Sequence, residues 1–229
     1  MSLSFGILVF PQVQQLDLTG PYEVFASVPD SAVHLIWKDG ETLRSATGLP
    51  FVPTATFETC PPLDVLCIPG GAGVNALLED EDVLDFVRAR GAEARYLTSV
   101  CTGALVLGAA GLLTGRRATT HWYAHDFLAR FGAVPVQDRV VRDGNLITAG
   151  GVTSGIDFGL AVVAELLGRE EAETVQLALE YAPAPPFSAG TPAEAPPEVL
   201  ERAKKRLSGS RAAREAIIGR ITSGSPSDR

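Results

Sequence analysis

YLTSVCTGALVL, residues Tyr96–Leu107, is the stretch that decides the fold of this chain. Its first part, Tyr96–Val100, is an apolar run typical of a buried strand, and the residues after Gly103 favour a helix. Cys101 therefore falls on a sharp strand-to-helix turn, the arrangement called a nucleophile elbow, with sulfur in place of a serine oxygen. Gly103 would let the helix start close to the strand.

The position of Cys101 favours a chemical role for its side chain. A helix N-terminus offers free N–H groups and a positive potential, and both favour the thiolate, which is the nucleophilic form. The alternative is a buried structural cysteine, the commoner fate of a cysteine after an apolar run. Cys67, inside a predicted strand, and Cys60, before two prolines, are expected to be structural.

Apolar runs and helical patterns alternate along the rest of the chain. This alternation predicts an α/β fold: a single-domain α/β/α sandwich with a mostly parallel central sheet and helices on both faces. Such folds hold their chemistry at the carboxyl ends of the strands. The first helix is expected to open at Gly20-Pro21, because proline suits the first helical turn. Strands are predicted at 5–10, 32–37, 64–68 and 96–100, a hairpin over 42–54, a strand pair around Asp143-Gly144, and further helices at 82–90, 102–110, 123–131, 152–167 and 170–181.

The C-terminal part of the chain differs in composition from the rest. Residues 183–197 hold six of the sixteen prolines. We expect an α/β domain over 1–182, and over 183–229 a proline-rich loop with C-terminal helices packed on that domain or at a dimer interface. Two amphipathic helical pieces are predicted at 198–207 and 211–221, and the end from Ser223 is expected to fray.

Charge and cysteine content exclude several classes of protein. The formal net charge of −8 over 229 residues excludes a generally basic nucleic-acid binder. Residues 198–229 carry eight Lys or Arg against four Asp or Glu, a net charge of +4, which is expected to mark a solvated helix or an oligomer contact. The three cysteines include no Cys-x-x-Cys pair, so a structural zinc site is not expected. No apolar segment resembles a signal peptide or reaches transmembrane length, which indicates a cytoplasmic protein with reduced thiols.

A candidate acid lies between the first strand and the first helix, in the segment Gln15-Leu-Asp-Leu-Thr-Gly-Pro21. Asp17 is expected beyond the carboxyl end of that strand, at the same sheet edge as Cys101. There a carboxyl group could hydrogen-bond to the sulfur and carry a proton, and burial would raise its pKa. Capping of the helix is an equally good interpretation of Asp17, and Glu23 is a rival acid.

Two glycine turns could bring backbone close to the cysteine. Ile68-Pro-Gly-Gly-Ala-Gly73 follows a strand, and its N–H groups, with Gly71 and Ala72 as candidates, could form an oxyanion-type pocket. Gly150-Gly151 follows another strand and offers Gly150 as a third candidate. A plain tight turn is the alternative for the first, which does not match a phosphate-binding loop, and a simple strand-to-helix turn is the alternative for the second.

Thr119-Thr-His-Trp-Tyr-Ala-His125 places two histidines after a short strand. His121 is expected near the site in a supporting role, and His125 is expected to be structural. The pair lacks a matching third ligand for a metal site.

These residues resemble the ThiJ/PfpI superfamily, whose fold is like that of class I glutamine amidotransferases. The resemblance runs from Phe5 to about Tyr181 and includes the SVCTG turn and the IPGG turn. Three narrower segments, LDLTGP, GRRATTHW and PPFSAGTP, resemble the isocyanide-hydrating members. The same segments are similar to the ligand domains of AraC-type regulators.

The resemblance implies a hydro-lyase that converts isocyanides to N-substituted formamides. Cys101 would attack the terminal carbon, Asp17 would supply a proton to give a thioimidate, and water activated by Asp17 would complete the reaction. Thr102 would bond to Asp17 or orient the water. The resemblance implies no metal, no organic cofactor, no nucleic-acid or membrane partner, and a homodimer.

Two other functions stay open. One is a catalytically silent ligand- or redox-sensing protein that uses Cys101 as its sensor; the regulators of this kind carry C-terminal helix-turn-helix motifs, for which this chain is expected to be too short. The other is a glyoxal-handling hydrolase of the same superfamily, although Asp17 stands where many such members place a glutamate.

Overall fold

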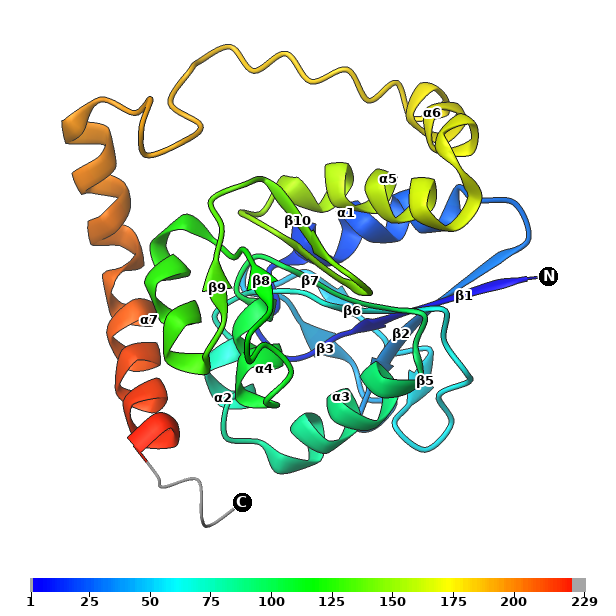
Figure 1. Cartoon of the computed structure of the whole chain (residues 1–229), viewed down its shortest axis with the longest axis horizontal. Helices are drawn as coiled ribbons and strands as arrows, with labels where there is room; N and C mark the ends of the chain where they lie inside the picture. The colour runs from blue at the N-terminus through cyan, green and yellow to red at the C-terminus, as the bar shows by residue number, and fades with distance from the viewer. Residues whose placement is uncertain (1, 224–229) are drawn as a thin grey trace.

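A seven-stranded sheet forms the centre of the computed structural model, which describes residues 2–223 (Figure 1). Every neighbouring pair in the sheet is parallel except the pair at one edge, β10 with β11. The predicted α/β fold with a mostly parallel sheet is therefore confirmed. In spatial order the strands are β10 (Val140–Asp143), β11 (Leu146–Ala149), β7 (Tyr96–Val100), β6 (Val65–Ile68), β1 (Leu3–Leu8), β2 (Ser31–Trp37) and β5 (Ala55–Thr56).

Helices cover both faces of the sheet (Figure 1). On one face α1 packs against α5, and α5 against α6; on the other, α4 contacts α2, α3 and the 3₁₀ helix η1. The bounds are α1 (Gln15–Ala26), α2 (Val74–Leu77), α3 (Glu81–Glu93), α4 (Gly103–Ala109), η1 (Trp122–Phe131), α5 (Ser154–Leu167), α6 (Arg169–Ala178) and α7 (Pro197–Ser223). Two small sheets, β3 (Leu43–Arg44) with β4 (Pro50–Phe51) and β8 (Arg117–Ala118) with β9 (Val134–Pro135), lie outside the main one.

The core is one continuous apolar cluster that joins the sheet to the helices on both of its faces. Strands β6 and β7 are buried along their whole length, as expected for strands covered on both faces. Phe5 of β1 stacks on Phe25 of α1 with ring centroids 4.4 Å apart, and Phe25 meets the ring of Phe158 in α5 edge to face. This aromatic chain fixes α1 and α5 on the sheet and so fixes the height of the α1 N-terminus.

The first helix starts earlier than the sequence indicates. The prediction that it opens at Gly20-Pro21 is wrong, because α1 begins at Gln15 and holds Pro21 in its interior. Proline removes one helical hydrogen bond there, but its ring lies directly over Gly155 of α5, where a Cβ atom would approach it to 3.0 Å. Close packing between helices thus offsets the lost bond. As a result Asp17 lies in the first turn of a helix and not in a loop.

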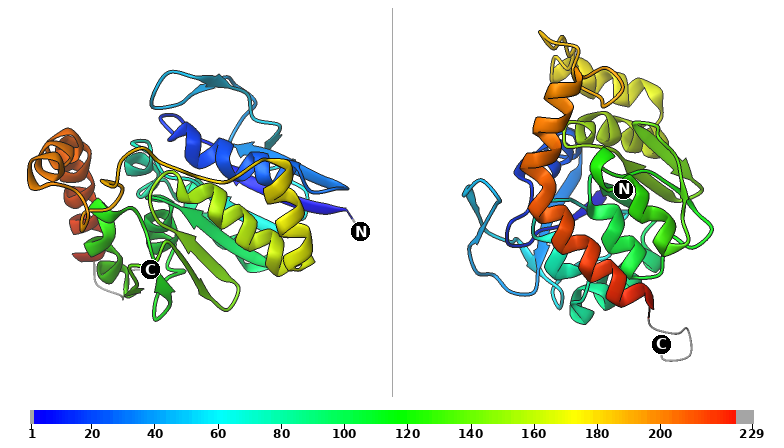
Figure 2. Two further views of the ribbon diagram at one scale, coloured as in Figure 1. Left: turned by 90° about the horizontal axis from the view of Figure 1, so that it is seen from above. Right: turned by 90° about the vertical axis from the view of Figure 1, so that its left-hand side faces the viewer.

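The C-terminal region forms one helix and not the two predicted pieces. α7 runs unbroken through Ser208-Gly209-Ser210 along one end of the sandwich, against η1 and α2 (Figure 2). Two ion pairs anchor α7: Arg211 pairs with Asp126 in η1, and Arg220 pairs with Glu79 just after α2. Tertiary packing therefore carries the helix through residues of low helix propensity.

The segment between α6 and α7 crosses the molecule with little contact. Residues 182–194 are all exposed, and the segment spans from one end of the sandwich to the other (Figure 1). The fraying expected from Ser223 onward begins at the last residue of α7, and residues 224–227 lie outside the described residues. Within residues 2–223, none of the helices combines the length and apolar character needed to cross a bilayer.

Candidate active site

Cys101 occupies the turn between β7 and α4 with a left-handed backbone conformation, φ 55°. Its N–H donates to the carbonyl oxygens of Gly150 at 2.8 Å and Ala149 at 3.1 Å, and its carbonyl accepts from Thr120 Oγ1 at 2.6 Å. A non-glycine residue at positive φ is strained, and these bonds hold it in place. The side chain is 6% exposed.

Gly103 allows the tight junction between strand and helix. A Cβ atom at this position would fall directly on the carbonyl oxygen of Ile68 in β6. The close approach expected for Gly103 from the sequence is therefore present, and α4 begins at the level of the neighbouring strand end.

Asp17 is fully buried in the first turn of α1. Gly70 N–H donates to its Oδ2 at 3.0 Å, while Oδ1 has no nitrogen or oxygen donor among the described residues. Burial raises the pKa of Asp17 to about 7, against the opposing effect of hydrogen bonds from the Cys101 thiol and Gly70. Glu23, the rival acid, is exposed on the outer face of the same helix.

Burial also raises the pKa of the Cys101 thiol well above its usual value. The charge of Asp17 adds to this effect, and a hydrogen bond from Thr102 N–H opposes it. The helix N-terminus does favour the thiolate, as the sequence suggests, but desolvation outweighs it. At pH 7 the Cys101 thiol therefore keeps its proton, while Asp17 is ionised for about half of the time.

Thr102 bonds to the glycine turn and not to Asp17. Its Oγ1 accepts from Gly71 N–H at 3.1 Å and lies within 3.5 Å of the Gly71 carbonyl oxygen. Thr102 Oγ1 and Asp17 Oδ2 both lie close to Gly70, so a Cβ atom at position 70 would lie only 2.7 and 2.8 Å from them. A glycine at position 70 is what lets acid, hydroxyl and cysteine converge.

The backbone candidates differ in what they offer. Gly71 N–H is bonded to Thr102, and Gly150 N–H donates to the carbonyl of Arg139 at 2.9 Å. Neither amide is therefore free to meet a developing charge in this structure. Gly71 and Ala72 do line the pocket over the cysteine, and Gly150 contributes its carbonyl to hold Cys101.

A pocket of about 210 Å³ opens over Cys101. Its wall combines segments that are far apart in the sequence: the loop before α1, the glycine turn at 69–73, η1 and α7. The lining residues are Gln14, Ala46, Gly71, Ala72, Cys101, Thr102, His121, Tyr123, Val152, Leu207, Ser210, Arg211 and Arg214.

His121 lines this pocket as a neutral side chain. Burial and the nearby charge of Arg214 lower its pKa to about 4. Its Nδ1 accepts from Tyr123 N–H at 3.2 Å, which places the ring proton on Nε2. His121 thus lines the pocket with its ring proton on Nε2, and no hydrogen bond joins it to Cys101 among the described residues. His125 bonds instead to the carbonyl of Val136 at 3.0 Å, away from the site.

Sequence patterns did not reveal the contribution of α7. Arg211 and Arg214 lie on the basic stretch that looks like a solvated helix, yet both reach the pocket, and Arg214 is buried. No local signal distinguishes them from the other basic residues of that helix.

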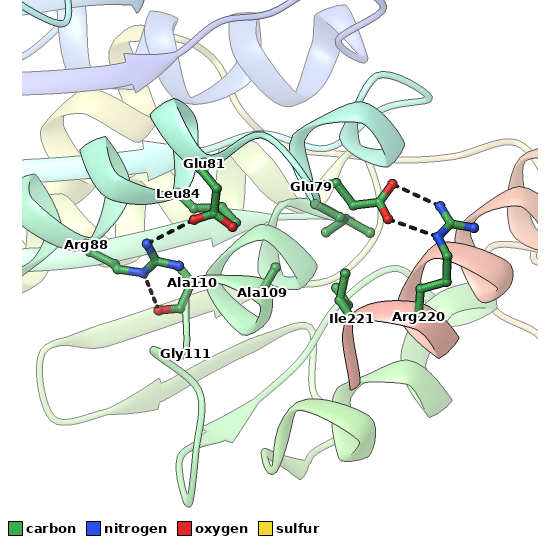
Figure 3. Close-up of a pocket in the computed structure, with 10 residues that line it drawn as sticks. Glu79, Glu81, Leu84, Arg88, Ala109, Ala110, Gly111, Arg220 and Ile221 are labelled. Carbon is green, nitrogen blue, oxygen red and sulfur yellow. Dashed lines mark hydrogen bonds and ion pairs between the residues drawn. The ribbon is translucent and has the colours of Figure 1, made fainter. Parts of the chain in front are cut away.

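A larger hollow of about 760 Å³ lies elsewhere, between α2, α3, α4 and the end of α7 (Figure 3). Its facing charges are paired, Glu79 with Arg220 and Arg88 with Glu81. Its lining holds no cysteine or histidine. Within residues 2–223, no three acidic, cysteine or histidine side chains converge as metal ligands would. Among the described residues, the candidate nucleophile and its acid therefore lie at the smaller pocket over Cys101.

Comparison with known proteins gives consistent matches along the chain. Residues 4–165 match the model of the DJ-1/PfpI family. The chain is 62% identical over 220 residues to the isonitrile hydratase of Pseudomonas putida, covering 96% of each chain. A ThiJ/PfpI family protein from Pseudomonas syringae superposes with a TM-score of 0.92 at 45% identity, covering 96% of this chain and 91% of that one. The HTH-type transcriptional regulator GbdR of Pseudomonas aeruginosa is 31% identical over 139 residues, 60% of this chain and 38% of the regulator.

Proposed function

Since this chain belongs to the DJ-1/PfpI family, we propose that it is an enzyme that hydrates isocyanides to N-substituted formamides, with Cys101 as the nucleophile. The observation that carries the proposal is the 62% identity to an isonitrile hydratase over nearly the full length of both chains. The site supports it with a buried thiol and a buried carboxyl whose pKa of about 7 lets it exchange a proton with the thiol beneath a small pocket.

The first step joins sulfur to the isocyanide carbon. The Cys101 thiol proton passes to ionised Asp17 while Sγ bonds to the terminal carbon of R–N≡C. Asp17 then gives the same proton to that carbon, which yields the thioimidate R–N=CH–S–Cys101. A pKa of about 7 suits Asp17 to both transfers, because general acid–base catalysis is most effective when the pKa lies near the working pH.

The second step adds water. Asp17, ionised again, takes a proton from water as its oxygen bonds to the thioimidate carbon, and the imine nitrogen receives that proton. The product, R–NH–CH(OH)–S–Cys101, collapses when the C–S bond breaks and the hydroxyl proton returns to sulfur. Formamide R–NH–CHO leaves, and thiol and carboxylate are restored, so no redox partner is needed.

The neighbouring groups act as supports in this scheme. Thr102 holds the glycine turn against Asp17 through Gly71. Nε2–H of neutral His121 is the pocket donor for the substrate nitrogen or the product oxygen. No oxyanion forms in the first step, so the internally bonded amides of Gly71 and Gly150 are compatible with it.

A turnover assay tests the proposal directly. The purified chain is mixed with a simple alkyl isocyanide, and the N-alkyl formamide is followed by NMR. A parallel reaction with methylglyoxal tests the glyoxal-handling alternative. Formamide formation at many turnovers supports the hydratase; turnover of methylglyoxal alone would overturn it. No turnover of either, with reversible oxidation of Cys101, would favour the sensing function.

We further propose that the chain acts as a homodimer. Leu177 in α6 and Phe187 in the following segment are 81% and 82% exposed. Exposed apolar side chains mark a partner contact where they gather into one patch, and we take Leu177 and Phe187 as the candidates for such a patch. A second copy of the chain is the partner expected from the resemblance, and it would cover the segment that crosses from α6 to α7.

A further inference from the structure

Helix α7 brings a buried cation to the pocket over Cys101. Arg214 is 7% exposed and lines the same pocket as the cysteine. Its Nη2 donates weakly to the Gly71 carbonyl at 3.4 Å and to Ser210 Oγ at 3.5 Å, while its Nε has no hydrogen-bond partner among the described residues. Taking a guanidinium out of water without a paired anion is costly, so its position calls for a compensating role.

Arg214 differs in this respect from Arg211, one helical turn earlier. Both terminal nitrogens of Arg211 donate to the carboxylate of Asp126, at 2.9 and 2.7 Å, and the guanidinium lies over the rings of Tyr123 and Phe127. Its charge is therefore compensated. Arg214 forms no ion pair with a carboxylate in the part of the chain described, residues 2–223.

The pocket holds no other charge that could neutralise Arg214. None of its lining residues is acidic, and His121 is neutral. The anionic group that Arg214 can face is the sulfur of Cys101 when it loses its proton. Burial lowers the pKa of Arg214, and ionised Cys101 opposes this effect; burial raises the pKa of the Cys101 thiol, and Arg214 opposes that effect in turn.

We propose that Arg214 is a positioning residue for the reaction: its buried guanidinium supplies the positive charge against which negative charge develops on Cys101 as the thiol proton moves to Asp17. It also holds the carbonyl of Gly71, whose N–H bonds to Thr102 beside the cysteine. That the electrophile is an isocyanide rests on the proposed function, but the effect of Arg214 on the sulfur does not depend on which electrophile Cys101 attacks.

Alkylation of Cys101 tests the charge effect without any isocyanide. The rates of reaction with uncharged iodoacetamide and anionic iodoacetate, in which sulfur displaces iodide, are compared for the wild type, Arg214→Met and Arg214→Lys between pH 8 and 10. Loss of an opposite charge raises a thiol pKa by about one unit, which lowers the thiolate fraction about tenfold. Higher nucleophilicity of the more basic thiolate offsets part of this, so the iodoacetamide rate should fall about threefold in Arg214→Met.

The ratio of the iodoacetate rate to the iodoacetamide rate shows whether the charge of Arg214 acts in the pocket. Arg214→Met should react still more slowly with iodoacetate, because the pocket has lost the charge that attracts the carboxylate, and Arg214→Lys should restore much of the ratio. An unchanged ratio and unchanged iodoacetamide rate in a folded Arg214→Met protein would overturn the proposal.

Two control variants separate charge from packing. Arg220 lies on the same helix as Arg214 but outside the pocket over Cys101, and it forms an ion pair with Glu79. Arg220→Met therefore loosens the packing of α7 without removing a charge from the pocket. It should keep the wild-type rate ratio; an equal loss in Arg220→Met and Arg214→Met would show a purely structural role and refute the proposal. Cys101→Ala measures background alkylation of buried Cys60 and Cys67.

Turnover then distinguishes this inference from the proposed function. If the chain hydrates isocyanides, Arg214→Met should lower kcat more than it raises KM, because the charge acts on the reacting sulfur. A rate ratio that depends on Arg214 in a protein without hydratase turnover would sink the proposed function alone. Turnover with a rate ratio independent of Arg214 would sink this inference alone.

Discussion

The proposed proton transfer from Cys101 to Asp17 sets what each side chain must do. Cys101→Ala and Cys101→Ser should abolish formamide production, because neither forms the thioimidate. Asp17→Asn should slow it by about 10²–10⁴-fold, since the amide can neither take the thiol proton nor deliver one to carbon. Initial rates of formamide appearance measure both effects. Full turnover by Cys101→Ala would rule out the nucleophile.

The same pair predicts an acid limb in the pH profile. Asp17 must be ionised to accept the thiol proton, and its pKa lies at about 7. The value of kcat/KM should therefore fall as the pH drops below about 7 and level off above it. Because the thiol pKa is raised well above its usual value, no second break is expected near neutrality. Rates from pH 5 to 9 measure this, and a limb that survives in Asp17→Asn would assign it to another group.

Burial of Asp17 should also be visible in stability. The pKa rises from 3.8 to about 7 on folding, so between these pH values the folded chain binds more protons than the unfolded chain, and stability falls as the pH rises. Asp17→Asn lacks this penalty. It should be more stable than the wild type at pH 8, by at most about 4 kcal/mol, and the difference should shrink towards pH 4. Urea unfolding at both pH values tests the trend, and a lower stability of Asp17→Asn at pH 8 would contradict it.

At the level of elements, two glycines in helices have opposite roles. A Cβ atom at Gly103 would meet the carbonyl of Ile68, whereas one at Gly209 in α7 would meet nothing within 4 Å. Gly103→Ala should lower the free energy of unfolding by about 1–3 kcal/mol, because backbone must shift. Gly209→Ala should raise it by about 0.5–1 kcal/mol through helix propensity. Urea unfolding measures both, and equal effects would contradict the packing argument.

The elements show where sequence patterns succeed and where they do not. Buried parallel strands such as β6 and β7 are unbroken apolar runs, so they are visible in the sequence, as is the turn at Cys101 between strand and helix. The start of α1 was misplaced because Pro21 is a good first residue for a helix, and only its contact with Gly155 shows why it is tolerated inside one. The unity of α7 likewise depends on contacts with η1 and α2, which no local pattern encodes.

The site residues likewise include some that sequence patterns can place and others that they cannot. Asp17 and Cys101 could be placed at one sheet edge because both follow parallel strands, and in the structure they lie close enough for each to affect the pKa of the other. The bonding of Thr102 to Gly71 and the internal bonds of Gly71 and Gly150 depend on loop geometry that spacing does not specify. Arg214 could not be found, because a basic residue on an amphipathic helix looks the same whether it faces water or a pocket.

For the whole molecule, the proposed dimer gives a prediction at the exposed apolar surface. Combining Leu177→Ser with Phe187→Ser should shift the chain towards monomer, since both side chains would otherwise be buried by the partner. Val52→Ser is the matched control, because Val52 is 54% exposed and follows β4, which pairs with β3 outside the main sheet. Sedimentation velocity measures the shift. A monomeric wild type, or a double variant that remains fully dimeric, would contradict the proposed interface.

The long excursion from α6 to α7 has a consequence for how the protein is made. Cys101 and Asp17 are synthesised early, but the wall that carries Arg211 and Arg214 comes from the final helix. During translation Cys101 is thus present in a nascent chain that still lacks this wall of the pocket. A product truncated before α7 would retain the cysteine–carboxyl pair without its cover, which would leave Cys101 open to water and oxidants.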